Sequence, residues 1–391
     1  MIATFRPSLG PEELEAVRSV FDSGWLGMGE VTNQFERRLA QFLGARHVVA
    51  VGCGTAALHL ALDALELEPE AEVIVPSLTF VATVQAIRMA GATPVFCEVR
   101  PETLNLDPAD ALARITSRTR VILPVHYAGL PCDLEPLLAE ARRRRLRVIE
   151  DAAHAFGARY QGRPVGTLGD LTCFSFDAIK NITCGEGGAV ATEDAELAGR
   201  IACRRKLGID TRFPPASPEE ASWPYHVLTH GFRYHLPDLN AAIGMVQLER
   251  FPAFQERKRE IVRRYDAAFA DLPELEPLEH DLEQTCPWAY VVKVPGPRRD
   301  AFREHLHRRG VATLIQFVPN HLQPAFAQWR ADLPVTERLV QQIVSLPLYV
   351  KMTDADVETV IQAVRSFDDR SRRSTMTCSR ALGKGIDAVA S

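Results

Sequence analysis

Lys180 is the residue with the clearest chemical potential, and it stands in the segment FDAIKNITCGEGG (176–188). Most lysines are solvated surface charges, whereas the residues directly beside this one are apolar or uncharged. Burial in such a segment would lower the pKa of the amine and favour its neutral, nucleophilic form. Gly185, Gly187 and Gly188 would let the backbone turn tightly nearby. The pattern is typical of a lysine that attacks an aldehyde.

Asp151 is a second candidate, because it follows the apolar run LRVIE (146–150). A carboxylate at the end of a buried strand is costly to desolvate unless it meets a cation. The protonated nitrogen of a pyridine ring would supply one. An aspartate can also cap the next helix, so both roles stay open.

A turn of small residues, 52–55 (GCGT), separates the apolar run HVVAV (47–51) from a helical pattern. Free N–H groups and the dipole at a helix N-terminus suit a phosphate, although a plain tight turn would give the same pattern. Ser175 lies near the end of the run LTCFSF (171–176), and Phe80 comes shortly after the run EVIV (72–75). Phe80 could equally be a core residue.

Polar residues that follow the strands of an open α/β sheet gather at one edge. His126 and Tyr127 end a further run (120–125), where a lone histidine is more often structural than catalytic. A phosphate cradle, an aromatic ring, a carboxylate and a lysine at one edge fit pyridoxal 5'-phosphate (PLP) better than any other cofactor. The glycine motifs of nicotinamide-binding and nucleoside triphosphate-binding proteins are absent from the sequence.

Hydrophobic patterning predicts the elements that position these groups. Short apolar runs alternate with amphipathic stretches, which indicates parallel strands joined by crossover helices. We therefore expect an α/β fold with a doubly wound, mostly parallel seven-stranded sheet. The strand candidates are 47–51, 72–75, 94–99, 120–125, 146–150, 171–176 and 188–192. Helices are expected over 56–65, 81–89, 108–115 and 134–145.

A smaller α+β domain is expected after a long helical pattern over 239–269. Its predicted strands are 288–294 and 312–318, and its predicted helices are 299–309 and 354–367, with Thr353 as the N-cap of the last. We divide the chain into a cofactor-binding large domain, a small domain and a polar, arginine-rich tail that we expect to be disordered. These parts span 1–250, 251–367 and 368–391.

Composition excludes several classes of function. The 391 residues, 46% of them hydrophobic, can bury a large core. The net charge of -5 does not indicate the basic surface that a nucleic-acid-binding protein needs. We find neither a membrane-spanning stretch nor the plan of a signal peptide, so we expect no membrane partner and a cytoplasmic location. The eight cysteines include no C-x-x-C pair, which favours reduced thiols over a disulfide or metal framework.

The stretches that carry these residues resemble the DegT/DnrJ/EryC1/StrS family, the sugar aminotransferases of PLP fold type I. The resemblance runs from about Pro7 to Phe367. The matching motifs are SGWLGMGE (23–30), GTAALHLAL (54–62), VPSLTFVAT (75–83), VHYAGLPCD (125–133), EDAAHAFGA (150–158), CFSFDAIKNITCGEGGAV (173–190), LPDLNAAIG (236–244), HLQPAF (321–326) and SLPLY (345–349).

The resemblance implies a role for each candidate residue. Lys180 becomes the Schiff-base lysine that also carries protons, and Asp151 becomes the partner of the pyridine nitrogen. The other implied cofactor contacts are His154 to the ring hydroxyl, Phe80 stacked on the ring, and Thr55, Ala56 and Ser175 to the phosphate. The candidate substrate contacts are His126, Tyr127 and His321. No metal is expected.

The resemblance also implies a homodimer with active sites at the interface, because a residue of the partner subunit usually contacts the cofactor phosphate in this family. In GFRYHLPDLN (231–240), Arg233 and His235 stand where asparagine and arginine are frequent. We expect Arg233 to contact the phosphate. The type of side chain that makes this contact then differs from the one that is usual in the family. Cys53 replaces a usual serine.

The implied reaction moves the amino group of L-glutamate to a nucleotide-linked keto-sugar, for amino-sugar and cell-surface polysaccharide biosynthesis. Family frequency favours amination at C4 of a 4-keto-6-deoxyhexose. One alternative is a PLP-dependent sugar dehydratase, but similar dehydratases carry histidine where this chain has Lys180. The other is a non-catalytic regulator that keeps the fold, against which the intact set of Lys180, Asp151 and Ser175 argues.

Overall fold

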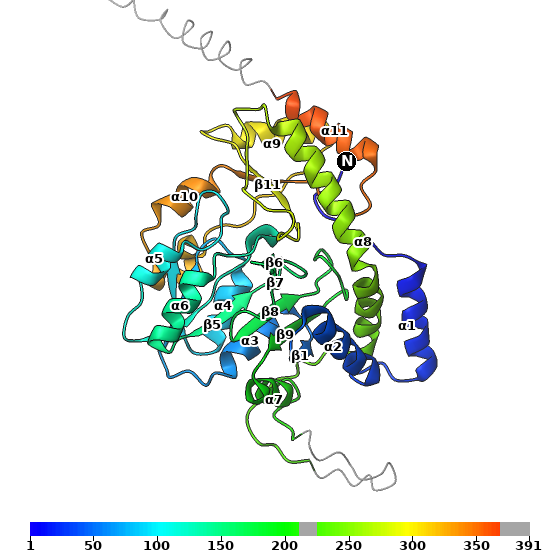
Figure 1. Ribbon diagram of the computed structural model, residues 1–391, viewed down its shortest axis with the longest axis vertical. Coiled ribbons are helices and arrows are strands. Elements are labelled where there is room, and N and C mark those ends of the chain that lie inside the picture. The colour runs from blue at the N-terminus through cyan, green and yellow to red at the C-terminus, as the bar shows by residue number, and fades with distance from the viewer. Residues whose placement is uncertain (211–224, 368–391) are drawn as a thin grey trace, which may run out of the picture.

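The computed structural model describes residues 1–210 and 225–367, so the predicted tail over 368–391 lies outside the described residues. A seven-stranded sheet forms the centre of the large domain (Figure 1). Its strands lie in the order β1 (His47–Val51), β9 (Gly188–Thr192), β8 (Leu171–Ser175), β5 (Arg147–Asp151), β4 (Thr119–Ile122), β2 (Glu72–Pro76) and β3 (Thr93–Cys97). β9 is antiparallel to both neighbours and the other pairs are parallel. The predicted mostly parallel sheet is confirmed.

Helices cover both faces of this sheet, as the doubly wound prediction requires. One face packs against α3 (Gly54–Asp63), α4 (Val81–Met89) and α7 (Ala195–Arg204). The other packs against α2 (Glu30–Leu43), α5 (Pro108–Ala113), α6 (Glu135–Arg144) and the start of α8 (Asp238–Phe269). Val49 and Val51 belong to the first core and Val48 and Ala50 to the second. Two buried faces explain why the strands are apolar at successive positions.

A smaller antiparallel sheet contains β10 (Glu276–Pro277), β11 (Tyr290–Lys293) and β12 (Ile343–Leu346). The end of α8 packs with this sheet, α9 (Arg299–Arg308) and α11 (Asp354–Arg365) in one apolar core. The 32-residue α8 therefore runs from the large sheet to the small one (Figure 1). The expected domain division at residue 250 falls inside this helix, and the domain limits stay a prediction.

The remaining elements are short or peripheral. They are α1 (Pro11–Ser23), β6 (Arg159–Tyr160), β7 (Arg163–Pro164), α10 (Pro334–Val340) and the 3-10 helices η1 (Tyr127–Gly129), η2 (Asn320–Leu322) and η3 (Pro324–Trp329). The predicted cap of α11 is confirmed, because the hydroxyl of Thr353 accepts a 3.1 Å hydrogen bond from the Asp356 N–H.

The strand predicted over 312–318 is wrong. Within this segment Leu314 makes an isolated bridge to Ser345, and β12 is the strand that pairs with β11. The apolar side chains of this segment do not all face one core: Leu314 and Val318 are 42% and 57% exposed, whereas Phe317 packs into an apolar cluster.

Three structural findings bear on the classes of function. Over residues 1–210 and 225–367, no helix combines the length and apolarity of a membrane span. The same residues contain no group of three or more histidine, cysteine or acidic side chains that could hold a metal ion. Seven of the cysteines are free thiols, and Cys378 lies outside the described residues.

Candidate active site

Lys180 lies in the loop between β8 and β9, beyond the carboxyl end of β8. Its Nζ is 4.4 Å from the centre of the Trp288 ring. Burial lowers the pKa of the amine to about 8, although the negative charges of Asp151 and Asp177 oppose this change. The neutral amine that a nucleophile requires is therefore more accessible than in a solvated lysine.

Asp151 ends β5 and is 4% exposed. Its Oδ2 accepts a 2.7 Å hydrogen bond from the hydroxyl of Thr83, and its Oδ1 accepts one of 3.1 Å from the N–H of Ala153. Burial raises the pKa of this carboxyl, and the two hydrogen bonds and the charge of Lys180 act against that rise. A carboxylate that is buried and held in this way is stabilised by a cation placed against it.

The imidazole of His154 stacks on the Trp288 ring, with 3.6 Å between ring centroids and 9° between planes. Burial keeps the pKa of His154 well below its ordinary value, so the ring is neutral. Its buried Nδ1 has no hydrogen-bond partner among the described residues. Because an unpaired buried nitrogen costs free energy, a polar group of a bound molecule would stabilise this arrangement.

The first turn of α3 touches the end of β8. A Cβ added to Gly54 would lie only 2.8 Å from the Cβ of Ser175, so glycine is required for this close approach. Thr55 and Ala56 follow in the same turn, where backbone N–H groups are free of helical partners. The N–H of Ala56 donates to the thiol of Cys53 at 3.4 Å, and sulfur is a weak acceptor that a phosphate oxygen could replace.

Phe80 precedes α4 and is 55% exposed. Its ring lies 5.7 Å from that of Phe317, centroid to centroid. Asn320 fixes the backbone before Phe80, because its side-chain amide donates to the carbonyls of Ser77 at 3.1 Å and Thr79 at 2.8 Å. The small domain therefore positions an open aromatic ring beside the strand ends.

His126 is fully buried between two elements of the large domain. Its Nδ1 accepts the N–H of Cys132 at 2.9 Å, so Nε2 carries the proton and donates to Glu150 at 2.9 Å. The other oxygen of Glu150 accepts hydrogen bonds from Gly169 and Thr172. Both ring nitrogens of His126 are thus occupied by the protein itself.

Tyr127 and His321, the other predicted substrate contacts, are each 1% exposed. The hydroxyl of Tyr127 donates to the carbonyl of Gln316. His321 pairs with the Ser77 hydroxyl at 2.6 Å and with Glu337 at 3.1 Å. These contacts place both side chains beneath the exposed surface of the site, and their assignment to the substrate stays a prediction.

Arg233 is exposed in the single chain, and its backbone forms an isolated bridge with Lys206. No carboxylate of the described residues pairs with its guanidinium. Arg233 is therefore not brought together with Lys180 and Asp151 by intrachain contacts. Its proposed contact with a partner subunit's cofactor stays a prediction.

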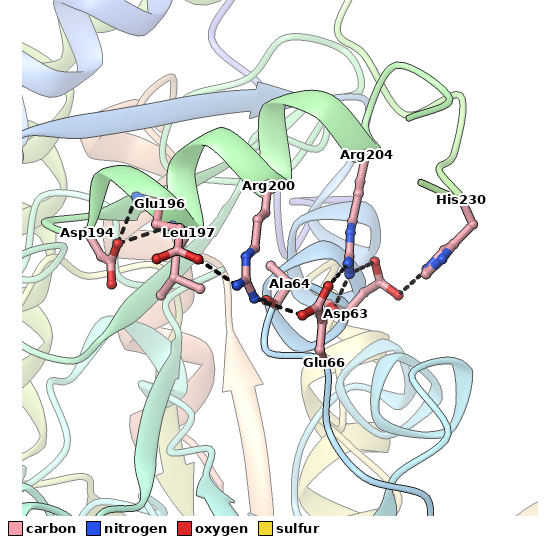
Figure 2. A network of polar contacts seen from close by, with 9 residues as sticks. All are labelled: Asp63, Ala64, Glu66, Asp194, Glu196, Leu197, Arg200, Arg204 and His230. Carbon is pink, nitrogen blue, oxygen red and sulfur yellow. Dashed lines mark hydrogen bonds and ion pairs between the residues drawn. The ribbon is translucent and has the colours of Figure 1, made fainter. Parts of the chain in front are cut away.

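A polar network anchors the segment that carries Arg233 (Figure 2). Arg204, near the end of α7, pairs with Asp63 at 2.7 Å and with Glu66, and His230 approaches Asp63 from the other side at 3.2 Å. The N–H of Phe232 donates to the carbonyl of Arg204. Since Asp63 ends α3, the network ties this segment to the helix whose first turn forms the phosphate cradle.

Sequence reasoning missed two residues of the site, Thr83 and Trp288. Thr83 lies in the first turn of α4 three positions after Phe80, which was a usable signal that it shares the strand edge. Trp288 lies 108 positions from Lys180, and no local pattern links them. Its indole N–H donates to the carbonyl of Ile179 at 2.9 Å, which fixes the ring under the lysine loop.

The residues present fit PLP. The close approach of Gly54 to Ser175 places a serine hydroxyl beside a helix N-terminus, which suits a phosphate, and the buried Nδ1 of His154 has no partner among the described residues. Asp151 would hold the ring nitrogen and Lys180 the aldehyde. The segments that carry these groups are far apart in the chain, yet the ends of β1 and β8 both pair with Gly188 at the start of β9.

Comparison with known proteins agrees with this geometry. Residues 7–365 match the DegT/DnrJ/EryC1/StrS aminotransferase family. The chain is 40% identical over 371 residues to the spore coat polysaccharide biosynthesis protein SpsC of Bacillus subtilis, covering 92% of this chain and 95% of SpsC.

Solved structures give the same result. The aminotransferase TlmJ from Streptoalloteichus hindustanus superposes with a TM-score of 0.88 at 37% identity, covering 96% of this chain and all of TlmJ. A sugar aminotransferase from Micromonospora echinospora gives a TM-score of 0.87 at 34% identity, covering 94% of this chain and 100% of that one. The chain therefore belongs to the DegT/DnrJ/EryC1/StrS aminotransferase family, and its cofactor is pyridoxal 5'-phosphate.

Proposed function

We propose that this protein transfers the amino group of L-glutamate to a nucleotide-linked keto-sugar, at C4 of a 4-keto-6-deoxyhexose. The products are 2-oxoglutarate and a nucleotide-linked amino sugar. The observation that carries the proposal is the meeting of Lys180 and Asp151 at one sheet edge beside the cradle of Gly54 and Ser175. The family supplies a sugar as the class of substrate. SpsC, by its name, serves spore coat polysaccharide biosynthesis, which supports a polysaccharide precursor here.

PLP, when bound, withdraws electrons from the carbon that carries the nitrogen. The chain supplies the rest. Lys180, held with a pKa near 8, can attack an aldehyde and then move a proton between carbon atoms in both halves of the reaction. Asp151 keeps the ring nitrogen protonated, and Thr83 fixes that carboxylate in position. In each half Lys180 accepts a proton from one carbon and donates it to another, so its amine ends each half with no net gain of protons.

We further propose that the enzyme acts in the cytoplasm as a homodimer, with Arg233 of each protomer placed at the other's cofactor phosphate. The exposure of Arg233 and its freedom from intrachain ion pairs among the described residues support this arrangement. Arginine suits the task, since its planar fork can bind a phosphate through two hydrogen bonds.

Neither alternative is favoured by an observation. A dehydratase of this family would carry histidine at the position of Lys180. A regulator that does no chemistry would gain nothing from the buried carboxylate of Asp151 or from the lowered pKa of Lys180.

A screen of nucleotide keto-sugars tests the proposal. Purified protein with PLP should be yellow, and L-glutamate alone should bleach it and release one equivalent of 2-oxoglutarate per site. Addition of the correct keto-sugar should restore the colour and form an amino sugar that mass spectrometry detects. A protein that stays yellow with glutamate, or that removes water from the sugar without adding nitrogen, would contradict the proposal.

A further inference from the structure

A small cavity lies next to Lys180, between the N-terminal segment, α8 and the turn after β12. Its volume is about 20 Å³, which is room for a small chemical group rather than for a whole molecule. It is therefore a candidate subsite for one end of a ligand that reaches Lys180.

The charged side chains that line this cavity are all cationic: Arg6, Lys180 and Lys258. The other polar residues of its wall are neutral: Ser8, Asn181, Thr183, Gln247 and Tyr349. Asp151 and Asp177 lie close enough to act on the charge of Lys180, whereas no carboxylate lines the cavity beside Arg6 and Lys258. An anion in the cavity would therefore stabilise the buried charge of Lys258. The lining thus has the composition of an anion site.

Lys258 is the residue of this wall that most strongly indicates an anion site. It is 7% exposed, and its ammonium donates one hydrogen bond, of 2.8 Å, to the side-chain carbonyl of Asn181. Neither Lys258 nor Arg6 forms an ion pair within residues 1–210 and 225–367. An ammonium has three N–H groups, so Lys258 keeps donors to offer. Burial lowers its pKa to about 8, which shows how little the protein alone stabilises the charge.

Contacts with the rest of the protein hold the N-terminal segment so that Arg6 lies at the cavity. Phe5 stacks on Trp288 with 4.9 Å between ring centroids, and Trp288 is the ring that lies under Lys180. The carbonyl of Thr4 accepts the N–H of Leu348 at 3.1 Å. The carbonyl of Ser8 accepts the side-chain amide of Gln247 at 2.8 Å. Arg6 is therefore held between two anchored residues and beside the lysine, although its own side chain is exposed.

We propose that this cavity binds one carboxylate of the amino donor, with Arg6 and Lys258 as the charged ligands and the hydroxyl of Tyr349 as a further donor. The inference rests on the proposed transamination and adds to it the site that selects an amino acid. The amine of the donor must react at the position of Lys180, so a carboxylate two bonds or a short chain away falls within reach of these cations. A keto-sugar carries no carboxylate, so we do not expect it to bind in this subsite.

The direct test measures binding of glutarate to the PLP-loaded enzyme by calorimetry. Glutarate keeps both carboxylates of the donor but has no amine, so it binds without reacting. Arg6→Gln is the first variant, because an exposed side chain can be replaced without loss of the fold. Lys258→Met tests the buried cation, and Tyr349→Phe the hydroxyl. Arg46→Gln is the matched control, since Arg46 is an exposed arginine paired with Glu193 on the large domain.

We expect Arg6→Gln and Lys258→Met each to raise the Kd of glutarate by about tenfold or more, the effect of losing a hydrogen bond to a charged group. The KM for glutamate should rise in the same variants, while the KM for the keto-sugar stays within about twofold. Arg46→Gln should change neither quantity. Unchanged glutarate binding in both Arg6→Gln and Lys258→Met would overturn the inference, as would an equal rise in the KM for the sugar.

Failure of the proposed function gives a different result. If the wild-type enzyme does not react with glutamate at all, the donor assignment is wrong, and glutarate binding still reports on the subsite by itself. If glutamate reacts normally but the Kd of glutarate is unchanged in Arg6→Gln and Lys258→Met, the proposed transamination is supported and the carboxylate subsite lies elsewhere. Binding of inorganic phosphate as tightly as glutarate would show a general anion site and would also overturn the inference.

Discussion

The amine of Lys180 lies 4.4 Å from the centre of the Trp288 ring, and two opposing effects act on it there. The face of an indole attracts a cation, whereas burial disfavours one. Burial lowers the pKa of Lys180 to about 8, against the opposing charges of Asp151 and Asp177. The tryptophan also stacks on His154, so a single ring supports both the reacting amine and a predicted contact of the cofactor.

The pKa of Lys180 predicts how covalent attachment of PLP depends on pH. A lysine of pKa about 8 has roughly 300-fold more neutral amine at pH 7 than one at the ordinary 10.5. The rate at which the apoenzyme binds PLP covalently should therefore rise with pH and level off above about pH 8. Stopped-flow absorbance on the apoenzyme measures it. A rate that still climbs steeply between pH 9 and pH 10 would contradict the lowered pKa.

Lys180→Ala should abolish turnover while leaving the fold intact. Loss of the amine removes both the attachment to the cofactor and the group that moves protons in the two half-reactions. Circular dichroism and the unfolding midpoint should match the wild type, and PLP should still bind without a covalent link. A variant that turns over, or in which borohydride still fixes PLP to the protein, would refute the assignment.

Asp151→Asn should fold and bind PLP but react slower by orders of magnitude. An amide cannot stabilise a protonated ring nitrogen as a carboxylate does, so the ring would withdraw electrons less strongly. Single-turnover kinetics with glutamate measure the loss. A rate within a few fold of the wild type would leave Asp151 with a structural role, such as its hydrogen bond from Ala153.

Thr83→Val separates positioning from chemistry at the same carboxylate. The substitution keeps the shape of the side chain but removes the 2.7 Å hydrogen bond to Asp151. We expect a loss of roughly tenfold in the rate with glutamate, because the carboxylate remains but is held less firmly. Thr83→Ser should restore most of the rate. A loss as large as that of Asp151→Asn, with no rescue by serine, would mean that valine disturbs the site in another way.

Arg204→Met and Arg200→Met should differ strongly in stability, although both residues lie on α7 (Figure 2). The side chain of Arg204 is 4% exposed and pairs with the mostly buried Asp63, so its loss leaves that carboxylate with the exposed His230 but without its arginine. We expect a cost of about 3 kcal/mol in the free energy of unfolding. Arg200, which is 35% exposed, should cost about 1 kcal/mol or less. Urea unfolding measures both, and equal losses would contradict the burial argument.

The sequence predicted the large sheet well because its signal is local. All seven strands are short apolar runs between turn residues, Asp151 and Ser175 end two of them, and Lys180 lies in the loop after β8. The prediction for 312–318 failed because an apolar run does not by itself show pairing: Leu314 makes an isolated bridge to Ser345, and Leu314 and Val318 are exposed.

The contacts that complete the site are not local. Trp288 beneath Lys180, and Asn320 behind Phe80, come from the small domain and depend on how α8 carries the chain across. His126 shows a second limit of prediction from the sequence. It was a candidate substrate contact, and the structure shows both of its ring nitrogens hydrogen-bonded to Cys132 and Glu150, so its assignment to the substrate stays a prediction. Spacing in a sequence shows which edge a residue reaches but not which way its side chain turns.

Arg233→Ala should weaken PLP retention by about 1.5–3 kcal/mol, the range for a hydrogen bond to a charged group. Dialysis against buffer without PLP, followed by absorbance of the protein, measures the retained cofactor. Arg38→Ala is a suitable control, because Arg38 is an exposed arginine paired with Glu249. The loss by itself does not say which subunit Arg233 serves, so a mixing experiment is needed.

The mixing experiment combines Lys180→Ala with Arg233→Ala, at a PLP concentration low enough that Arg233→Ala alone is severely impaired. If Arg233 acts across the interface, a mixed dimer has one site that carries both lesions and one that carries neither. Activity should then reappear when subunits exchange, up to about one intact site in each mixed dimer. Native mass spectrometry confirms the exchange. If mixed dimers form but the mixture stays as inactive as its two parents, Arg233 serves its own subunit and the proposed contact with the partner is wrong.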